Sequence, residues 1–373
     1  MSILFRSALP VLAALSLHAE TAASLKGFMY VGTLDYKLLV INERSADIVG
    51  EIPVGGIPRT VALSPDKTLL HLVTTKMQME TVDLAARKVI SSFPLSDGRS
   101  TPRMPRGAGG RAFSGLAVHP SGRYIYTTIS LTVKELDHFR VDPPQFVQID
   151  LQEKRIAKVM PFPKGYDQGF GFGASYRISP DGKLLYVFDD DIIVMELDTL
   201  KEVERIPLSR PEYPGASPHR LTASDDPNDA PGEVTSVFTS VDPIVHKETL
   251  GMAKIDLTTR KVNYQAIGPA FPMVGFALTP DRKLGYSLMI NKTGANREAE
   301  FWVWDIASQR VIRKAPVPAR ISFRLGMSSD GGMLYLYGAG STIEFFDTAT
   351  LQSKKLLSLN KDTTTNLIVM AGR

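Results

Sequence analysis

Cysteine and histidine, the side chains that most often hold metals and redox cofactors, are scarce in this chain. Its 373 residues include no cysteine and six histidines. Without a thiolate, the polypeptide cannot attach a c-type haem, build an iron–sulfur cluster or use a cysteine nucleophile. If such chemistry serves this protein, another chain must supply it.

None of the histidines has a second histidine or a carboxylate at ligand spacing on one predicted element, and a transition-metal site needs convergent ligands. His71 lies within a predicted strand and His119 stands beside a turn proline, which favours structural roles for both. His138, His219 and His246 lie on or near long loops. There, a polar contact is favoured over metal ligation.

Two other chemistries are weighed from short motifs. The triplet Asp189-Asp190-Asp191 has the oxygens that Ca²⁺ prefers. Consecutive residues of a strand point to opposite sides, so a charged turn is the favoured interpretation. No GxSxG motif and no paired-acid signature stands out, which argues only weakly against a hydrolase.

A segment rich in glycine and aromatic residues, KGYDQGFGFG, begins at Lys164. It does not match a phosphate-binding loop, because no GxGxxG motif follows a strand and opens a helix. Two interpretations stay open. The segment is either a flexible entry into the next strand or a set of aromatic anchors for a partner or pocket, formed by Tyr166, Phe170 and Phe172.

A second segment concentrates positive charge. The loop 96–113 contains Arg99, Arg103, Arg106 and Arg111 among proline and glycine residues. A solvated loop is the default interpretation. The functional alternative is a cationic patch that docks an acidic partner such as a cytochrome.

The scaffold behind these loops is seen most clearly from Tyr176 to Ser209. Alternating apolar residues and tight turns predict four strands there, at 176–179, 183–188, 192–197 and 202–208. A single four-stranded sheet has two faces and cannot bury both, so it needs copies of itself stacked alongside.

The chain supplies those copies. The turn before the fourth strand recurs seven times, at Asn42, Asp83, Asp150, Asp198, Asp256, Asp305 and Asp347. Self-similarity at this period, with four strands in each copy, is typical of a propeller. The predicted fold is therefore an all-β, seven-bladed β-propeller of four-stranded antiparallel blades.

The two ends of the repeat array predict how the ring closes. The first copy begins at its second strand, near Phe28, and so lacks an inner strand. A spare strand, 365–370, stands at the C-terminal end. We expect this strand to complete the first blade, which removes exposed sheet edges.

The repeats also indicate on which face of the ring each loop lies. Connections between strands one and two and between strands three and four lie on one face, and they are short except in the fifth blade. The long segments fall almost entirely on the opposite face, where binding function is expected. The candidate partner-facing or pocket-facing residues there are Arg103, Arg106, His138, Phe139, Tyr166, Phe170, Phe172, Tyr213 and His219.

The N-terminal residues read as a secretory signal peptide. One positive charge in residues 1–6 precedes a short apolar run, and the segment around His18 is small and polar. We expect residues 1–23 to be the signal, with cleavage after Ala19 or Ala23, and residues 24–373 to form one periplasmic domain. The apolar run is too short to span a membrane. The net charge of +4 is small, which argues against nucleic-acid binding.

The repeats beginning YVGTLDYKLLV and SPDGKLLYVF resemble the YVTN-type propeller repeat of exported bacterial proteins. A closer likeness covers most of the mature chain. The run LDHFRV from Leu136, followed by VDPPQFVQIDLQEKRI and by the order of the later loops, resembles the β-subunit of quinohemoprotein amine dehydrogenase. The loop 96–113 is not matched by that likeness.

The resemblance implies a cofactor-free, non-catalytic propeller that docks two other chains and helps to wall the substrate pocket. One partner would be a dihaem cytochrome-like chain with c-type haem, and the other a small chain with a tryptophylquinone. No catalytic, cofactor-binding or metal-binding residue is expected on this chain. The alternatives are an exported scaffold that binds protein or glycan, and a propeller lactonase or other hydrolase.

Overall fold

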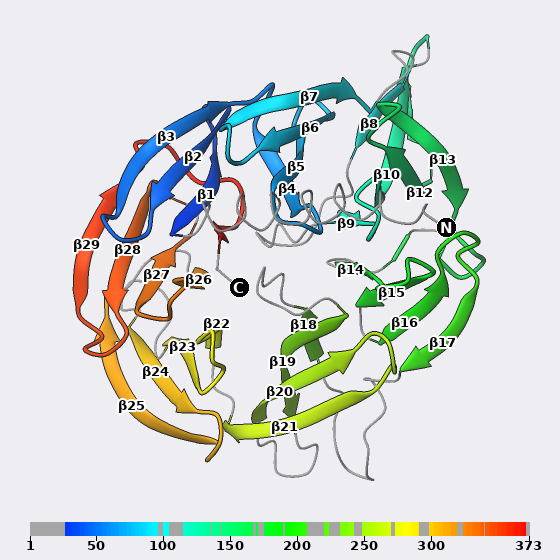
Figure 1. Ribbon diagram of the computed structural model, residues 1–373. Coiled ribbons are helices and arrows are strands. Elements are labelled where there is room, and N and C mark those ends of the chain that lie inside the picture. Colours follow the sequence, from blue (N-terminus) through cyan, green and yellow to red (C-terminus); the bar gives the residue numbers. More distant parts are fainter. Residues whose placement is uncertain are drawn as a thin grey trace, which may run out of the picture.

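A computed structural model gives the fold (Figure 1). It describes residues 27–95, 100–103, 115–134, 136–141, 143–166, 169–170, 175–188, 191–206, 220–223, 232–241, 248–269, 273–290, 298–318, 324–338 and 340–370. These residues form strands and turns and contain no helix. In the same residues, no helix has the length and apolar character needed to cross a membrane.

The strands form seven antiparallel sheets arranged in a ring, which confirms the predicted seven-bladed propeller (Figure 1). Written from the centre outward, the first four blades are as follows. Blade 1 contains β30 (Ile368–Val369), β1 (Phe28–Thr33), β2 (Lys37–Asn42) and β3 (Asp47–Pro53); blade 2 contains β4 (Pro58–Leu63), β5 (Leu69–Thr74), β6 (Gln78–Asp83) and β7 (Lys88–Pro94); blade 3 contains β9 (Ala117–Val118), β10 (Tyr124–Lys134), β12 (Gln145–Asp150) and β13 (Arg155–Pro161); blade 4 contains β14 (Ser175–Ile178), β15 (Leu184–Phe188), β16 (Ile192–Glu196) and β17 (Glu202–Ile206).

The other three blades repeat the same order. Blade 5 contains β18 (Arg220–Ala223), β19 (Glu233–Val241), β20 (Glu248–Asp256) and β21 (Val262–Pro269); blade 6 contains β22 (Met273–Leu278), β23 (Leu284–Ile290), β24 (Ala299–Asp305) and β25 (Arg310–Val317); blade 7 contains β26 (Arg324–Met327), β27 (Met333–Tyr337), β28 (Thr342–Asp347) and β29 (Ser353–Ser358). Two further strands, β8 (Ser100–Arg103) and β11 (Phe139–Val141), extend blade 3.

The C-terminal strand closes the ring, as predicted, although only Ile368 and Val369 form the strand itself. They pair with Tyr30 and Met29 of β1. The preceding residues add contacts to the same strand: the backbone N–H of Thr364 donates to the Gly32 carbonyl, and the Gly32 N–H donates to Thr365 Oγ1, each at 2.8 Å. Closure therefore depends on a short strand reinforced by a threonine-rich segment.

The turn between the third and fourth strands has one geometry in all seven blades. An acidic or amide side chain ends the third strand, and the fourth residue after it has positive φ, as at Ala46, Arg260 and Leu351. In blade 4 this side chain is Glu196, and not Asp198 as the repeat comparison predicted. The Leu200 N–H donates to the Glu196 carbonyl at 2.9 Å. Glu196 and Asp198 are both acidic and stand two residues apart, so the repeat pattern alone did not distinguish them.

Tyrosine links neighbouring blades at a repeated position. The third residue of the second strand is tyrosine in blades 1, 3, 4, 6 and 7. The Tyr186 phenol donates to the Leu257 carbonyl of blade 5 at 2.5 Å, and the Tyr30 phenol reaches the Leu84 carbonyl of blade 2. In blade 2 the same position is His71, whose Nδ1 lies 3.0 Å from Thr81 Oγ1. Its Nε2 is buried with no hydrogen-bond partner.

This buried histidine makes stability depend on pH. Burial lowers the pKa of His71 from 6.5 to about 4. As the pH falls, the histidine is protonated in the unfolded chain before it is protonated in the folded chain. The free energy of unfolding is therefore largest above about pH 6.5 and decreases as the pH drops towards about 4. Between about pH 7 and about pH 5 the loss amounts to roughly 2 kcal/mol. Urea unfolding of His71→Gln should lack this loss, whereas His138→Gln, at an exposed histidine, should retain it. Equal slopes for the two variants would contradict this assignment.

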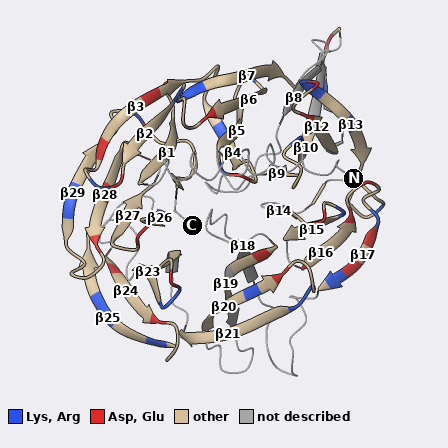
Figure 2. Cartoon of the chain, in the orientation of Figure 1, with Lys and Arg blue, Asp and Glu red and all other residues tan. Residues whose placement is uncertain are grey.

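The outer strands protect the rim of the ring. In every blade but the fifth, the register of the outer strand skips one residue near its start, which forms a β-bulge. The skipped residues are exposed: Val49, Ile90, Ala157, Val203, Ile312 and Lys354. Bulges and charges on an edge strand oppose pairing with another sheet, and Figure 2 shows both charge signs along the outer strands.

Candidate docking face

The two faces of the ring carry different connections. We call the face with the connections between strands one and two and between strands three and four the turn face. We call the opposite face, with the remaining connections, the loop face. Antiparallel order places the connection from β10 to β12 and the connection from β7 to β9 on the loop face. Both of these connections contribute to the same structure.

That structure is an extension of blade 3. β10 is eleven residues long, and its second half pairs with β11 on one side and with β8 on the other. The pairs include Lys134 with Phe139 and Ser130 with Arg103. We name β8, β11, residues 130–134 of β10 and residues 136–138 the blade-3 arm. In Figure 1 its tip lies beyond the outline of the ring.

The tip of the blade-3 arm exposes two large apolar side chains. Leu136 has a relative exposure of 105% and Phe139 of 67%, the two highest values among large apolar side chains in the described residues. Between them, His138 Nδ1 lies 2.7 Å from Asp137 Oδ1. Apolar side chains with this exposure gain most from burial by another molecule.

Of the predicted aromatic anchors, Phe170 is placed in the wall between blades 3 and 4. It is 8% exposed and packs edge-on against Phe162, with ring centroids 4.8 Å apart. Phe146 and Tyr176 complete the cluster. Phe170 thus fastens its loop to the core, and its ring does not project from the surface.

Tyr166 fastens the same loop at its polar end. Its phenol donates to Glu202 Oε2 at 2.9 Å and accepts a hydrogen bond from Arg205. Arg205 also donates to Glu202 Oε1 at 3.0 Å and lies 3.6 Å from the Asp191 carboxylate. Hydrogen bonds from Arg205 hold the pKa of Glu202 below its usual value. Asp191 therefore belongs to an ion-pair cluster on the edge of blade 4.

For the remaining predicted site residues, the structure describes either the backbone alone or nothing. Arg103 lies on β8, and only its backbone is described. Arg106, Phe172, Tyr213 and His219 lie outside the described residues. The structure therefore unites His138 and Phe139 in the blade-3 arm and Tyr166 and Phe170 beside blade 4. Leu136 was missed as a candidate, although an apolar residue between Glu135 and Asp137 was a usable signal.

In the part of the chain that the structure describes, no three histidine or carboxylate side chains are grouped so that they could hold a metal ion. His119 begins the turn between the first two strands of blade 3, at the position that serine occupies in blades 2, 4 and 7. Its Nδ1 lies 2.8 Å from Ser121 Oγ.

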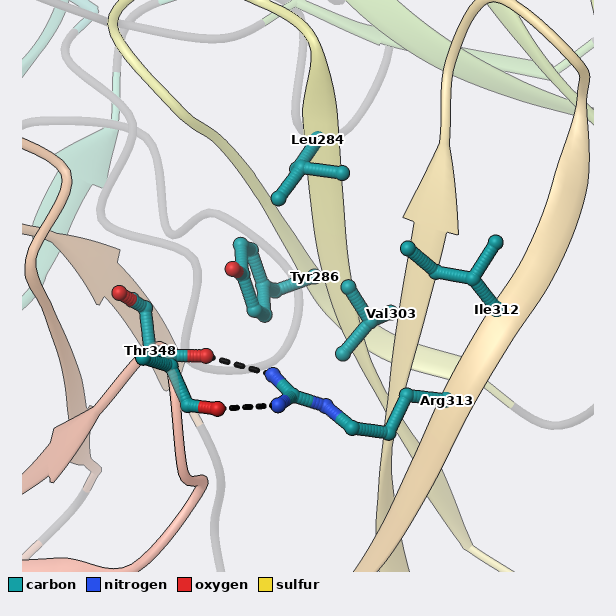
Figure 3. A pocket seen from close by; sticks show the side chains of 7 residues that line it. Leu284, Tyr286, Val303, Ile312, Arg313 and Thr348 are labelled. Atoms are coloured by element: carbon teal, nitrogen blue, oxygen red, sulfur yellow. Dashed lines mark hydrogen bonds between the residues drawn. The ribbon is translucent and has the colours of Figure 1, made fainter.

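A shallow pocket of about 430 Å³ lies on the turn face, at the seam between blades 6 and 7 (Figure 3). Arg313 crosses this seam and donates to the Thr348 carbonyl at 2.5 Å and to the Ala349 carbonyl. The rest of the lining is mainly apolar: Leu284, Tyr286, Val303 and Ile312. The arrangement ties two blades together, and we assign it a structural role.

The comparisons with known proteins support the fold. No protein-family profile matches the sequence, and no curated protein matches it. Similar solved structures include a functionally unknown protein from Desulfotomaculum acetoxidans, with 9% identity, coverage of 93% of this chain and 100% of that chain, and a TM-score of 0.52. The β-propeller domain of Cps50 (Swd1) from Myceliophteria thermophila has 11% identity, coverage of 84% and 90%, and a TM-score of 0.51.

A third similar structure is dihydro-haem d1 dehydrogenase NirN in complex with DHE. It has 16% identity, covers 93% of this chain and 75% of that chain, and has a TM-score of 0.49. The two likenesses with TM-scores above 0.5 show the propeller fold and nothing about function.

Proposed function

We propose that this chain is the non-catalytic propeller subunit of a periplasmic amine dehydrogenase, and that it docks the cofactor-bearing chains on its loop face. The observation that carries the proposal is the blade-3 arm. It is an irregular extension on an otherwise repetitive ring, and its tip exposes Leu136 and Phe139.

The amino-acid composition indicates which chain of the proposed complex would bind the haem. The chain has no cysteine, so a c-type haem in the complex must be bound by a partner. The resemblance of the blade-3 insertion to the amine dehydrogenase β-subunit supplies the rest: a dihaem cytochrome-like chain and a small tryptophylquinone chain as partners, with oxidative deamination of primary amines as the reaction. Export through the predicted N-terminal signal would place this chain in the periplasm, and its partners would need export signals of their own.

The blade-3 arm suits docking for physical reasons. Burying a leucine or phenylalanine side chain is worth roughly 1.5–3 kcal/mol. Strand pairing on both sides of β10 gives these side chains a rigid base, so little ordering entropy is lost on binding. Aromatic anchors of this kind often dominate an interface.

The double substitution Leu136→Ser and Phe139→Ser should release the partners. Because both side chains are exposed, the melting temperature should stay within a few degrees of the wild type, while the haem absorbance that co-purifies with the tagged chain should fall at least about tenfold. Ile90→Ser is the matched control, since Ile90 is 48% exposed on the outer strand of blade 2. Equal haem recovery from both variants would remove the blade-3 arm from the docking surface.

The second candidate function is an exported scaffold that binds protein or glycan without redox partners. It makes the same use of the exposed blade-3 arm but requires no haem-bearing chain. A colourless chain that co-purifies with another protein through Leu136 and Phe139 would favour it.

A further inference from the structure

The outer strand of blade 5 lacks both of the features that protect the other outer strands of the ring. The first missing feature is charge. The eight residues of β21, VNYQAIGP, include no aspartate, glutamate, lysine or arginine. Each of the other six outer strands contains at least one charged residue. Among the outer strands that the structure describes, β21 is therefore the uncharged one.

The second missing feature is a β-bulge near the start of the strand. Residues 262–266 pair with residues 251–255 in unbroken register, and the residue that the register skips is Ile267, near the end of β21. Ile267 is buried, whereas the skipped residues of the other six blades are exposed. Bulges twist an edge away from a second strand. Without an early bulge, residues 262–266 form a regular edge.

The backbone of this edge offers hydrogen-bonding groups to the outside of the ring. The Asp256 N–H donates to the Lys261 carbonyl at 3.0 Å. Because the bonds of an antiparallel ladder alternate, the N–H and C=O groups of Val262 and Ala266 point away from β20. β21 ends the strand order of its sheet and lies on the outer rim (Figure 1). An uncharged, regular edge of this kind is a template for another strand.

The side chains of β21 suit a neighbour with the same sequence. Val262 and Tyr264 lie on one side of the strand, partly buried against the core between blades 4 and 5. Asn263 and Gln265 are neutral and lie on the other side. If two copies pair antiparallel about an axis at Tyr264, Val262 meets Ala266 and Asn263 meets Gln265. Apolar side chains then meet apolar ones, and amides meet amides.

The missing charge favours a second copy of this chain over a different partner. A twofold axis sets a strand against its own reversed sequence, so charges of one sign repel, as Lys354 and Lys355 of β29 would. A different partner would compensate such charges with opposite ones, and has no need of an uncharged edge. Lys261 precedes β21, and the two copies of it would lie at opposite ends of the pair, about 20 Å apart.

We propose that two copies of this chain associate through β21, which pairs antiparallel with the β21 of the second copy around a twofold axis. The two four-stranded sheets of blade 5 then join into one continuous sheet. Because β21 lies on the rim, the contact leaves the blade-3 arm uncovered, and the inference does not depend on the proposed docking function. The contact is small, so we expect a dissociation constant in the micromolar range.

The test is sedimentation velocity of the mature chain at concentrations from about 1 to about 100 µM. A dimer should grow with concentration. Ala266→Pro removes an N–H that points to the second copy and should raise the dissociation constant at least about tenfold, and Ala266→Lys should act in the same direction. Proline already ends β3, β7, β13 and β21, so the fold accepts it on outer strands. Val159→Pro, at an exposed residue of β13, is the matched control and should leave association unchanged.

Hydrogen exchange places the contact on the chain. Exchange of the amides in residues 262–266 should slow as the concentration rises, while exchange in β13 should not change. The melting temperatures of the three variants verify that they fold.

A wild-type chain that stays monomeric up to about 100 µM would overturn the inference. A dimer that Ala266→Pro and Val159→Pro affect equally would also overturn it, because the contact would then lie elsewhere. A different protein that co-purifies with the wild type and is lost from Ala266→Pro, in the absence of a dimer, would assign the edge to a foreign strand instead.

Discussion

Removal of the chain from residue 363 onward should abolish cooperative folding of the ring. The deletion strips β1 of its inner partner and removes three largely buried apolar side chains, Leu367, Val369 and Met370. At roughly 1.5–3 kcal/mol for each side chain, the loss is roughly 5 kcal/mol or more before the backbone hydrogen bonds are counted. This is comparable to the whole stability of many domains. Thermal denaturation and size-exclusion chromatography should show an early, broad transition and aggregation through the open edge.

Two isosteric substitutions within the same segment refine this prediction. Thr365→Val removes the oxygen that accepts from the Gly32 N–H, and should cost about 1–3 kcal/mol. Thr364→Val removes a buried hydroxyl oxygen that has no hydrogen-bond partner, and should be neutral or stabilising. A deletion variant that melts like the full chain would show that the ring is held closed by something other than this segment.

Glu43→Leu should be the most damaging single substitution at the seam between blades 7 and 1. Glu43 is 7% exposed and accepts from the Ser329 N–H at 3.0 Å, from Ser329 Oγ at 2.6 Å and from the Tyr335 phenol at 2.7 Å. Burial and the Glu43 carboxylate raise the pKa of Tyr335, so this phenol keeps the proton that it donates. Leucine would remove the acceptor of one buried donor, the Tyr335 phenol, and of two half-buried donors on Ser329, at a cost of about 3 kcal/mol.

The matched control for Glu43 lies on the same blade. Glu51 is a surface glutamate that pairs with Lys37 at 2.6 Å, and Glu51→Leu should cost less than about 1 kcal/mol. Urea unfolding measures both variants. Similar losses for the two substitutions would contradict the view that Glu43 latches the ring.

The repeat pattern predicted the ring well because each blade obeys the same local rules. The turn prolines, glycines and aspartates recur in sequence because each satisfies a backbone requirement, as Asp256 does by accepting from the Thr258 and Thr259 N–H groups. The prediction was wrong at Asp198: in blade 4 the third strand ends at Glu196, whose Oε2 accepts from the Thr199 hydroxyl and whose carbonyl accepts from the Leu200 N–H. The closing strand was found because an inner strand was missing from the first copy. Its real length depends on tertiary pairing, which the pattern does not contain.

The candidate site was less predictable. The insertion around His138 and Phe139 was visible, but not its pairing with residues 100–103, because that contact joins segments about thirty residues apart. The glycine-rich context of Phe170 left open a flexible entry into the next strand or an anchor for a partner or pocket, and it did not indicate that Phe170 packs against Phe146 and Phe162. The sequence did not indicate a structural role for Glu43, because its partners Ser329 and Tyr335 come close to it only in the closed ring.

We propose that this chain docks the cofactor-bearing chains of an amine dehydrogenase. The most direct test is mild purification of the tagged wild-type protein from its own host, followed by a visible spectrum and an assay of amine-driven dye reduction. We expect a haem Soret band and amine-dependent turnover that co-purify with the chain. A colourless, inactive, monomeric propeller would contradict the proposed function and favour the exported binding scaffold.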